Sequence, residues 1–240
     1  MARIFLAGAS GAIGQRLVPL LLKAGHQVVG TTRSEAKTAL LRSLGATPAV
    51  VDVFDAAALR GLVVAHEPEV VIHQLTALPE GLSSLGGAAK ERAIRENARI
   101  RIEGTPNLVG AALAAGARRL IAQSIAWIYA PGREPHVESD PVDMGASGLA
   151  GISIQGTMAL ESAVLGSALA SVELRYGGLY GPGTGHDTAW RDPAVHVDAV
   201  TVNWSMSVPD REGMGIPVTW PPVLEISKSA VAFPPVTTML

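Results

Sequence analysis

Short apolar runs alternate with longer segments of mixed polarity along the first three quarters of the chain. Six runs predict β-strands, at about residues 4–7, 26–32, 49–51, 69–73, 118–122 and 171–176. The segments between them predict helices, one that ends at Gly25 and four at about 35–44, 56–65, 88–115 and 152–165. Strands that alternate with helices of this length are typical of βαβ units and a parallel sheet. We therefore predict an α/β fold over residues 1–183, with a Rossmann-type doubly wound parallel sheet.

The helical pattern has one internal irregularity and a clear end. Gly104 and Pro106 interrupt the segment 88–115, and because proline lacks a backbone donor, we expect a kink or break near Glu103. Beyond this domain prolines become frequent and apolar runs short, and we predict no long helix after about residue 200. We expect residues 184–240 to form a small, irregular C-terminal substrate lobe or a tail.

The first predicted strand runs into the most informative motif of the chain, Gly8-Ala-Ser-Gly-Ala-Ile-Gly14. Between a strand and a helix, the first glycine permits a tight turn, the second lets backbone approach a diphosphate, and the third lets the helix pack on the strand. The N-terminus of the helix then offers unpaired N–H groups to an anion. We expect this motif to bind a dinucleotide rather than form a merely structural turn. The expected contacts are Gly8, Ser10, Gly11, Ala12, Ile13 and Gly14.

The end of the second predicted strand bears on the choice of dinucleotide. NAD-binding units carry an acidic residue about 20 positions after the glycines, which bonds the ribose hydroxyls. This chain has Thr32 and Arg33 there, so no carboxylate repels a 2′-phosphate and a guanidinium is available to pair with one. We predict NADP as the preferred cofactor, with NAD possible. The alternative is that Arg33 only covers a solvated loop.

Further cofactor contacts are expected at the carboxyl ends of the other predicted strands, where ligands of open α/β sheets bind. Asp52 is placed to accept a hydrogen bond from the adenine amino group while Val53 packs on the ring. Alternatively, Asp52 or Asp55 caps the helix that follows. The remaining expected contacts are Gln74, Leu75, Thr76, Gln123, Tyr176 and Gly178.

Two hydroxyl groups after the fifth predicted strand are candidates for catalysis. Ser124 either hydrogen-bonds a substrate carbonyl or satisfies local backbone, and Tyr129 either donates a proton or packs. His73, at the end of the fourth strand, is expected to bond backbone.

Composition excludes several other classes of protein. Hydrophobic residues make up 48% of the chain and charged residues 17%, with a formal net charge of -2, so we expect neither a nucleic-acid nor a membrane partner. The chain has no cysteine, no signal-peptide pattern and no apolar run of membrane-spanning length, so we expect a cytoplasmic protein with a small-molecule substrate. No metal site is expected, because two His–Asp pairs lack further convergent ligands. These pairs are His186 with Asp187 and His196 with Asp198.

Together the motifs resemble the extended and atypical short-chain dehydrogenase/reductase superfamily, within its NAD-dependent epimerase/dehydratase group. Their order and spacing match through about residue 183, and a His-Val-Asp motif at 196–198 also matches. The matching pieces are Gly8–Gly14, Asp52-Val53, Val70–His73, Gly104–Leu108, Ser124–Tyr129, Leu174–Pro182 and His196–Asp198.

One part of the family pattern is missing. The resemblance implies a Tyr-x-x-x-Lys pair at the start of the helix that carries Glu161, with the tyrosine as general acid/base and the lysine holding the nicotinamide ribose. The segment 151–157 has no tyrosine, no lysine lies between Lys90 and Lys228, and Arg101 replaces a family asparagine. Since an unassisted tyrosine has a pKa of about 10, the standard proton relay cannot be assembled.

The resemblance implies an NAD(P)-dependent oxidoreductase or epimerase/dehydratase-like enzyme with a non-standard proton relay, acting on a small carbonyl or hydroxyl compound. The missing pair leaves a second class open, a non-catalytic NADP-binding redox sensor or regulatory protein. The resemblance also implies a homodimer formed through the helices 88–115 and 152–165. Alanines there either let helices approach across that interface or face their own sheet. They are Ala111, Ala112, Ala114, Ala115, Ala159 and Ala163.

Overall fold

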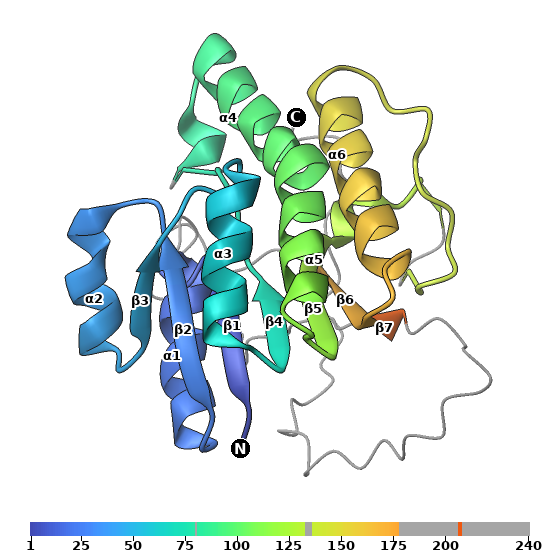
Figure 1. The fold of residues 1–240 in the computed structure, drawn as a ribbon. Coiled ribbons are helices and arrows are strands. Elements are labelled where there is room, and N and C mark those ends of the chain that lie inside the picture. Colours follow the sequence, from blue (N-terminus) through green and yellow to red (C-terminus); the bar gives the residue numbers. More distant parts are fainter. Residues whose placement is uncertain (80, 133–135, 178–205, 208–240) are drawn as a thin grey trace, which may run out of the picture.

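The computed structural model describes residues 1–79, 81–132, 136–177 and 206–207. These residues form a sheet with the strand order β3-β2-β1-β4-β5-β6-β7, in which β7 is antiparallel to β6 and all other pairs are parallel (Figure 1). The strands are β1 (Arg3–Ala7), β2 (Gln27–Thr32), β3 (Thr47–Val50), β4 (Val70–His73), β5 (Arg119–Ile125), β6 (Ala170–Tyr176) and β7 (Met206–Ser207). The predicted α/β fold with a Rossmann-type doubly wound parallel sheet is confirmed.

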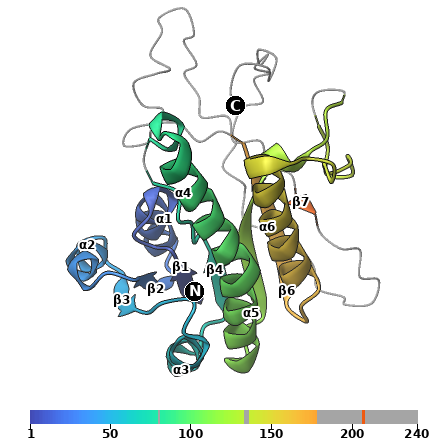
Figure 2. The same ribbon diagram turned by 90° about the horizontal axis from the view of Figure 1, so that it is seen from above.

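Helices cover both faces of this sheet (Figures 1 and 2). Alternate residues of β1 face opposite sides: Ile4 and Leu6 pack with α1 and α2, whereas Phe5 and Ala7 pack with α3, α5 and α6. The helices are α1 (Ala12–Lys23), α2 (Thr38–Ser43), α3 (Ala56–His66), α4 (Gly87–Arg99), α5 (Thr105–Ala114) and α6 (Gly148–Leu165). Short 3-10 turns lie at Glu35–Lys37, Leu82–Ser84 and Ala126–Ile128.

The predicted helix 88–115 is interrupted near the expected place. A π-helical turn, Ile100–Gly104, separates α4 from α5, and Pro106 lies in the first turn of α5, where a missing N–H is tolerated. Gly104 allows close packing, because a Cβ there would lie 2.8 Å from Cγ1 of Val53. The π turn buries Arg101, of which only 4% remains exposed.

Two elements are longer than the sequence pattern predicts. β5 continues to Ile125 because β6 pairs with it through Ser124–Arg175 and Ile125–Tyr176. α6 begins four residues earlier than predicted, at Gly148. Glycines weaken the helical signal there, but Gly151 is needed, since a Cβ would lie 2.5 Å from the carbonyl oxygen of Ala146.

Two of the six alanines proposed for a dimer interface face their own sheet instead. Ala111 and Ala112 are buried in the core beneath α5, so the alternative interpretation is right for them. The other four are only partly buried.

Several predictions concern residues that lie outside the described ranges. Apart from the strand at 206–207, they include the whole of the expected lobe at 184–240. They also include Gly178 and the residues His186, Asp187, His196 and Asp198. Within the described ranges, no helix combines the length and apolar character needed to cross a membrane.

Candidate active site

The glycine motif forms a tight turn against the end of β4. Gly8 has a φ of +88°, and its N–H donates to Oγ1 of Thr31 at 3.1 Å. A Cβ at Gly8 would collide with the backbone of Gln74, and one at Gly14 would lie 2.5 Å from the carbonyl oxygens of Gly8 and Ala9. Only glycine fits at both places, so the roles predicted for the first and third glycines agree with the structure.

The N-terminus of α1 opens at this turn. Gly11 precedes the helix, no side chain caps it, and its first turn contains no acidic residue. The first N–H groups of an α-helix have no acceptor within the helix, so those of Ala12, Ile13 and Gly14 are available to an anion. The Gln15 side chain donates to the carbonyl oxygen of Ser10 at 3.0 Å and holds the loop in place. This backbone cradle fits a diphosphate.

The end of β2 is tied to the same loop. Oγ1 of Thr32 accepts hydrogen bonds from the hydroxyl of Ser10 at 3.3 Å and from the N–H of Ser34 at 3.1 Å. Arg33 is exposed and has no hydrogen bond or ion pair within the described part of the chain. Its guanidinium therefore has all its donors available beside the turn.

The structure separates the two acidic residues after β3. Asp55 is the helix cap, because its side chain accepts from the N–H of Ala58 at 2.9 Å. Asp52 is exposed, and the one side-chain hydrogen bond it accepts among the described residues comes from the N–H of Phe54, so it can also bind a ligand. The side chain of Val53 is buried in the core, and an adenine ring would meet mainly its backbone.

Buried amides line the carboxyl ends of β4 and β5. Nε2 of Gln74 donates to the hydroxyl of Tyr176 at 3.3 Å, which joins two of the predicted cofactor residues across the sheet. Oε1 of Gln74 and Oε1 of Gln123 are buried and have no hydrogen-bond partner among the residues that the structure describes. Since buried polar atoms are nearly always paired, these oxygens fit N–H groups of a ligand. Leu75 is partly buried and Thr76 exposed beside them.

Ser124 is fully buried and makes a short contact with α6. Its hydroxyl donates to Oε1 of Glu161 at 2.5 Å rather than to local backbone. Glu161 also pairs with Arg175 of β6 through two bonds of 2.7 and 2.9 Å. These hydrogen bonds and ion pair raise the pKa of Arg175, which stays positively charged.

Tyr129 belongs to the same network. Nη1 of Arg175 donates to its hydroxyl at 2.9 Å and also to the carbonyl oxygen of Glu138. The Tyr129 ring stacks on His136, which is hydrogen-bonded to Asp140 at 2.9 Å. Arg175 thus ties the loop after β5 to α6, and the Glu161–Arg175 ion pair links the two candidates, with Ser124 bonded to Glu161 and Tyr129 to Arg175.

His73 bonds backbone, as expected, at the end of β4. Its Nδ1 accepts from the N–H of Leu75 at 3.2 Å, and its Nε2 lies 3.0 Å from Oγ1 of Thr105. Burial, and secondly the positive charge of Arg101, lowers the pKa of His73 to about 4. The imidazole is therefore neutral near pH 7.

Three charged residues of this region were not among the predicted site residues: Arg101, Glu161 and Arg175. For Glu161 the signal was a single charge in the stretch Met158-Ala-Leu-Glu161-Ser-Ala-Val164. Arg101 and Arg175 have other charged residues two positions away, so the pattern does not single them out. A buried charge is usually paired. Sequence alone does not say which partner, since the three come from different elements. The described residues hold no cluster of three or more potential metal-ligating side chains.

The sheet order, the helices on both faces and the glycine turn together define a Rossmann-type α/β protein. The sequence model of the NAD dependent epimerase/dehydratase family matches residues 4–195, and the chain belongs to this family. The resemblance drawn from the motifs is confirmed.

Two curated proteins show how far the similarity extends. A 3-diazoavenalumate denitrifying reductase of Streptomyces sp. is 43% identical over 192 residues, which are 77% of this chain and 58% of that protein. The uncharacterized protein C2A9.02 of Schizosaccharomyces pombe is 56% identical over 46 residues, 19% of this chain and 16% of that one. The chain thus matches little more than half the length of the reductase.

Solved structures agree on the fold. The enzyme WbmG of Bordetella bronchiseptica, solved in complex with NAD, has a TM-score of 0.61 at 24% identity over 75% of this chain and 55% of its own. The UDP-glucose 4-epimerase of Thermotoga maritima, solved with UDP-glucose, has a TM-score of 0.60 at 24% identity over 75% and 57%.

Proposed function

We propose that this protein is an NAD(P)-dependent oxidoreductase that acts on a small molecule and prefers NADPH. The observation that carries this proposal is the glycine turn, with the first N–H groups of α1 open beside the unpaired Arg33. The backbone donors fit a diphosphate, and the guanidinium fits a 2′-phosphate. Family membership and the NAD bound to WbmG support a nicotinamide dinucleotide. The preference for NADPH rests on Arg33 alone.

The carboxyl ends of β4 to β6 would hold the nicotinamide end of the cofactor. When bound, a nicotinamide supplies a hydride donor or acceptor. The unpaired oxygens of Gln74 and Gln123 fit the N–H groups of its carboxamide. The hydroxyl of Tyr176, at the end of β6, accepts a hydrogen bond from the Gln74 amide and so fixes the direction of the Gln74 oxygen.

Of the two hydroxyl groups, that of Tyr129 is the stronger candidate for the proton donor. Ser124 is buried and its hydrogen is directed to Glu161, whereas the Tyr129 oxygen accepts from Arg175 and its own hydrogen is left to donate. The Arg175–Glu161 pair holds the phenol in position. We infer that Tyr129 takes the part of the missing family tyrosine and that Ser124 orients Glu161.

A second candidate reaction is favoured by the missing Tyr-x-x-x-Lys pair together with the relative's name. Reduction of a carbonyl leaves an oxygen anion that must be protonated, whereas a diazonium group that accepts a hydride releases N2 and leaves a C–H bond without a separate proton. The Streptomyces relative is named as a denitrifying reductase of a diazo compound. Such a substrate would not need the absent relay. The reductase relative also favours an enzyme over a non-catalytic sensor.

Turnover with NADPH tests the proposal. Purified protein is mixed with NADPH and a panel of aldehydes, ketones and aryl diazonium salts, and loss of the reduced-nicotinamide absorbance is followed. We expect turnover above background with at least one class. NADPH binding without turnover on any compound would favour the sensor, and reduction of diazonium salts alone would select the second reaction.

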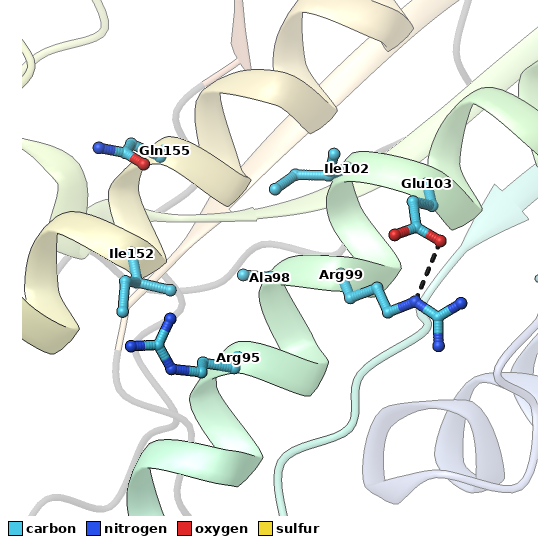
Figure 3. A pocket seen from close by; sticks show the side chains of 7 residues that line it. All are labelled: Arg95, Ala98, Arg99, Ile102, Glu103, Ile152 and Gln155. Atoms are coloured by element: carbon cyan, nitrogen blue, oxygen red, sulfur yellow. Dashed lines mark hydrogen bonds and ion pairs between the residues drawn. The ribbon is translucent and has the colours of Figure 1, made fainter.

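We further propose that the protein is a homodimer. α4 and α6 lie side by side (Figures 1 and 2), and between them runs a groove of about 300 Å³ (Figure 3). It is lined by Arg95, Ala98, Arg99, Ile102, Glu103, Ile152 and Gln155. Ile102 is 49% exposed, which an interface would explain. Light scattering at micromolar concentration should give twice the chain mass, and a monomeric mass would contradict the proposal.

The lack of cysteine agrees with a cytoplasmic location, which we also propose.

A further inference from the structure

Arg101 is a buried cation at the junction of three helices. It lies in the π turn between α4 and α5, and its Nη1 donates to Oγ1 of Thr157 at 2.7 Å and to the carbonyl oxygen of Ser153 at 3.4 Å. Both contacts belong to α6. Single π turns within helices are frequent at functional sites, because the extra residue redirects a side chain.

No carboxylate pairs with Arg101 within the described part of the chain. The nearby carboxylate of Glu161 forms its ion pair with Arg175 instead. Burial lowers the pKa of Arg101 to about 10, and attraction to Glu161 only partly opposes this effect. A buried charge without a counter-ion destabilises the folded state, and proteins tolerate this mainly at functional sites.

The position of Arg101 connects it with the candidate active site. Its charge acts on His73, at the carboxyl end of β4 beside the buried amide of Gln74. Its two contacts, Ser153 and Thr157, are four residues apart on α6. This is the spacing of the Tyr-x-x-x-Lys pair that is missing from the same helix. The positive charge on this face of α6 is therefore supplied by Arg101, which belongs to the π turn.

The free edge of the guanidinium indicates what it would bind. Nη1 is engaged by α6, and no hydrogen bond within the described residues engages Nε or Nη2. These two atoms carry parallel N–H donors that match the two oxygens of a carboxylate. A full negative charge also offsets the unfavourable burial of the cation, which a neutral hydroxyl does not.

We propose that Arg101 is the active-site cation of this protein and that it binds a carboxylate group of the substrate. The inference rests on the proposed function, since it places a substrate beside the cofactor site. It narrows the substrate class to small molecules that carry a carboxylate in addition to the group that is reduced.

The test uses benzoate as a probe and benzamide as its uncharged counterpart. Their affinities are measured by thermal shift on the full chain, with and without saturating NADPH. We expect benzoate but not benzamide to stabilise the wild type. Arg101→Gln should weaken benzoate binding by about tenfold to a hundredfold, the loss of charged hydrogen bonds. Arg92→Gln, the same change at an exposed position of α4, should leave it unchanged.

Other outcomes overturn the inference. Equal binding of benzoate and benzamide, or full benzoate binding by Arg101→Gln, would remove the carboxylate site. A loss of NADPH affinity in Arg101→Gln without benzoate would assign Arg101 to the cofactor instead. If Arg101→Gln does not fold, Arg101→Lys keeps the charge without the two-donor edge and should bind benzoate about tenfold less tightly. A wild type that binds benzoate but no NADPH would contradict the proposed function and leave the anion site standing.

Discussion

The two halves of the sheet have different chemical groups at the carboxyl ends of their strands. At β1 and β2 the site is backbone: a glycine turn, the N–H groups of α1, and hydroxyls that bond neighbouring backbone or each other. Beside β5 and β6 it consists of charges from β6 and the helices packed on it, with Glu161 of α6 paired to Arg175 and, among the described residues, no counter-ion for Arg101 of the π turn. A backbone site serves any dinucleotide, whereas buried charges select a particular substrate. The backbone half therefore carries the proposed cofactor site, and the charged half carries the proposed selection of the substrate.

The largest predicted effect is a pH dependence confined to the charged half. Glu173 of β6 is 2% exposed, and within the described part of the chain neither of its carboxylate oxygens has a hydrogen-bond partner. Burial, with repulsion from Glu161, raises its pKa to about 8, against 4.5 when unperturbed. Its contribution to stability is thus fully present below about pH 4.5 and is lost as pH rises through 8, on the order of a few kcal/mol.

Chemical denaturation at several pH values measures this loss. Glu173→Gln cannot ionise, so it should flatten the decline in the free energy of unfolding between the two pKa values, 4.5 and about 8. Wild-type stability that is level over this span would contradict the assignment.

Removing one partner of the buried ion pair should have the next largest effect. Glu161→Gln leaves the Arg175 guanidinium buried without its counter-ion and should lower the free energy of unfolding by about 3–5 kcal/mol. In the backbone half, Ser10→Ala removes only one neutral hydrogen bond and should cost about 0.5–1.5 kcal/mol. If urea denaturation shows equal losses in the free energy of unfolding for the two variants, the proposed difference between the halves is wrong.

How far each half could be predicted follows from this contrast. Gly8, Gly11 and Gly14 lie within seven residues, between a predicted strand and a predicted helix, so this local pattern indicates the turn and the fold and predicts a phosphate site. The Glu161–Arg175 and Arg101–Thr157 contacts join residues 14 and 56 positions apart, from separate elements. Their partners depend on helix packing, which the sequence pattern does not specify.

The catalytic assignment predicts an effect on turnover rather than on stability. Tyr129→Phe keeps the ring on His136 and removes the hydroxyl, so kcat should fall by about 10²–10⁴-fold while NADPH affinity stays the same. Ser124→Ala should reduce kcat less, because its hydroxyl is bonded to Glu161 and acts on the site through that carboxylate. Steady-state kinetics on a substrate from the panel gives both values. Near-full turnover in both variants would show that neither hydroxyl carries the chemistry.

A further prediction concerns the relative affinity for the two cofactors. Arg33→Ala should reduce the preference for NADPH over NADH by about ten- to a hundredfold, the value of a charge-assisted bidentate contact. Arg42→Ala provides a control on the neighbouring helix α2, where the guanidinium bonds Thr38. If Arg33→Ala keeps the full preference, the 2′-phosphate is bound elsewhere or NAD is the cofactor.

The central claim, that the glycine turn binds a nicotinamide dinucleotide, is tested most directly by calorimetric titration of the full chain with NADPH. The turn predicts one site per chain, and it predicts that Gly14→Val removes binding, since its side chain would occupy the space against the carbonyls of Gly8 and Ala9. Gly61→Val, in α3 with open space around it, should bind like the wild type. Absence of binding by the wild type at millimolar NADPH and NADH, or undiminished binding by a folded Gly14→Val, would contradict the claim.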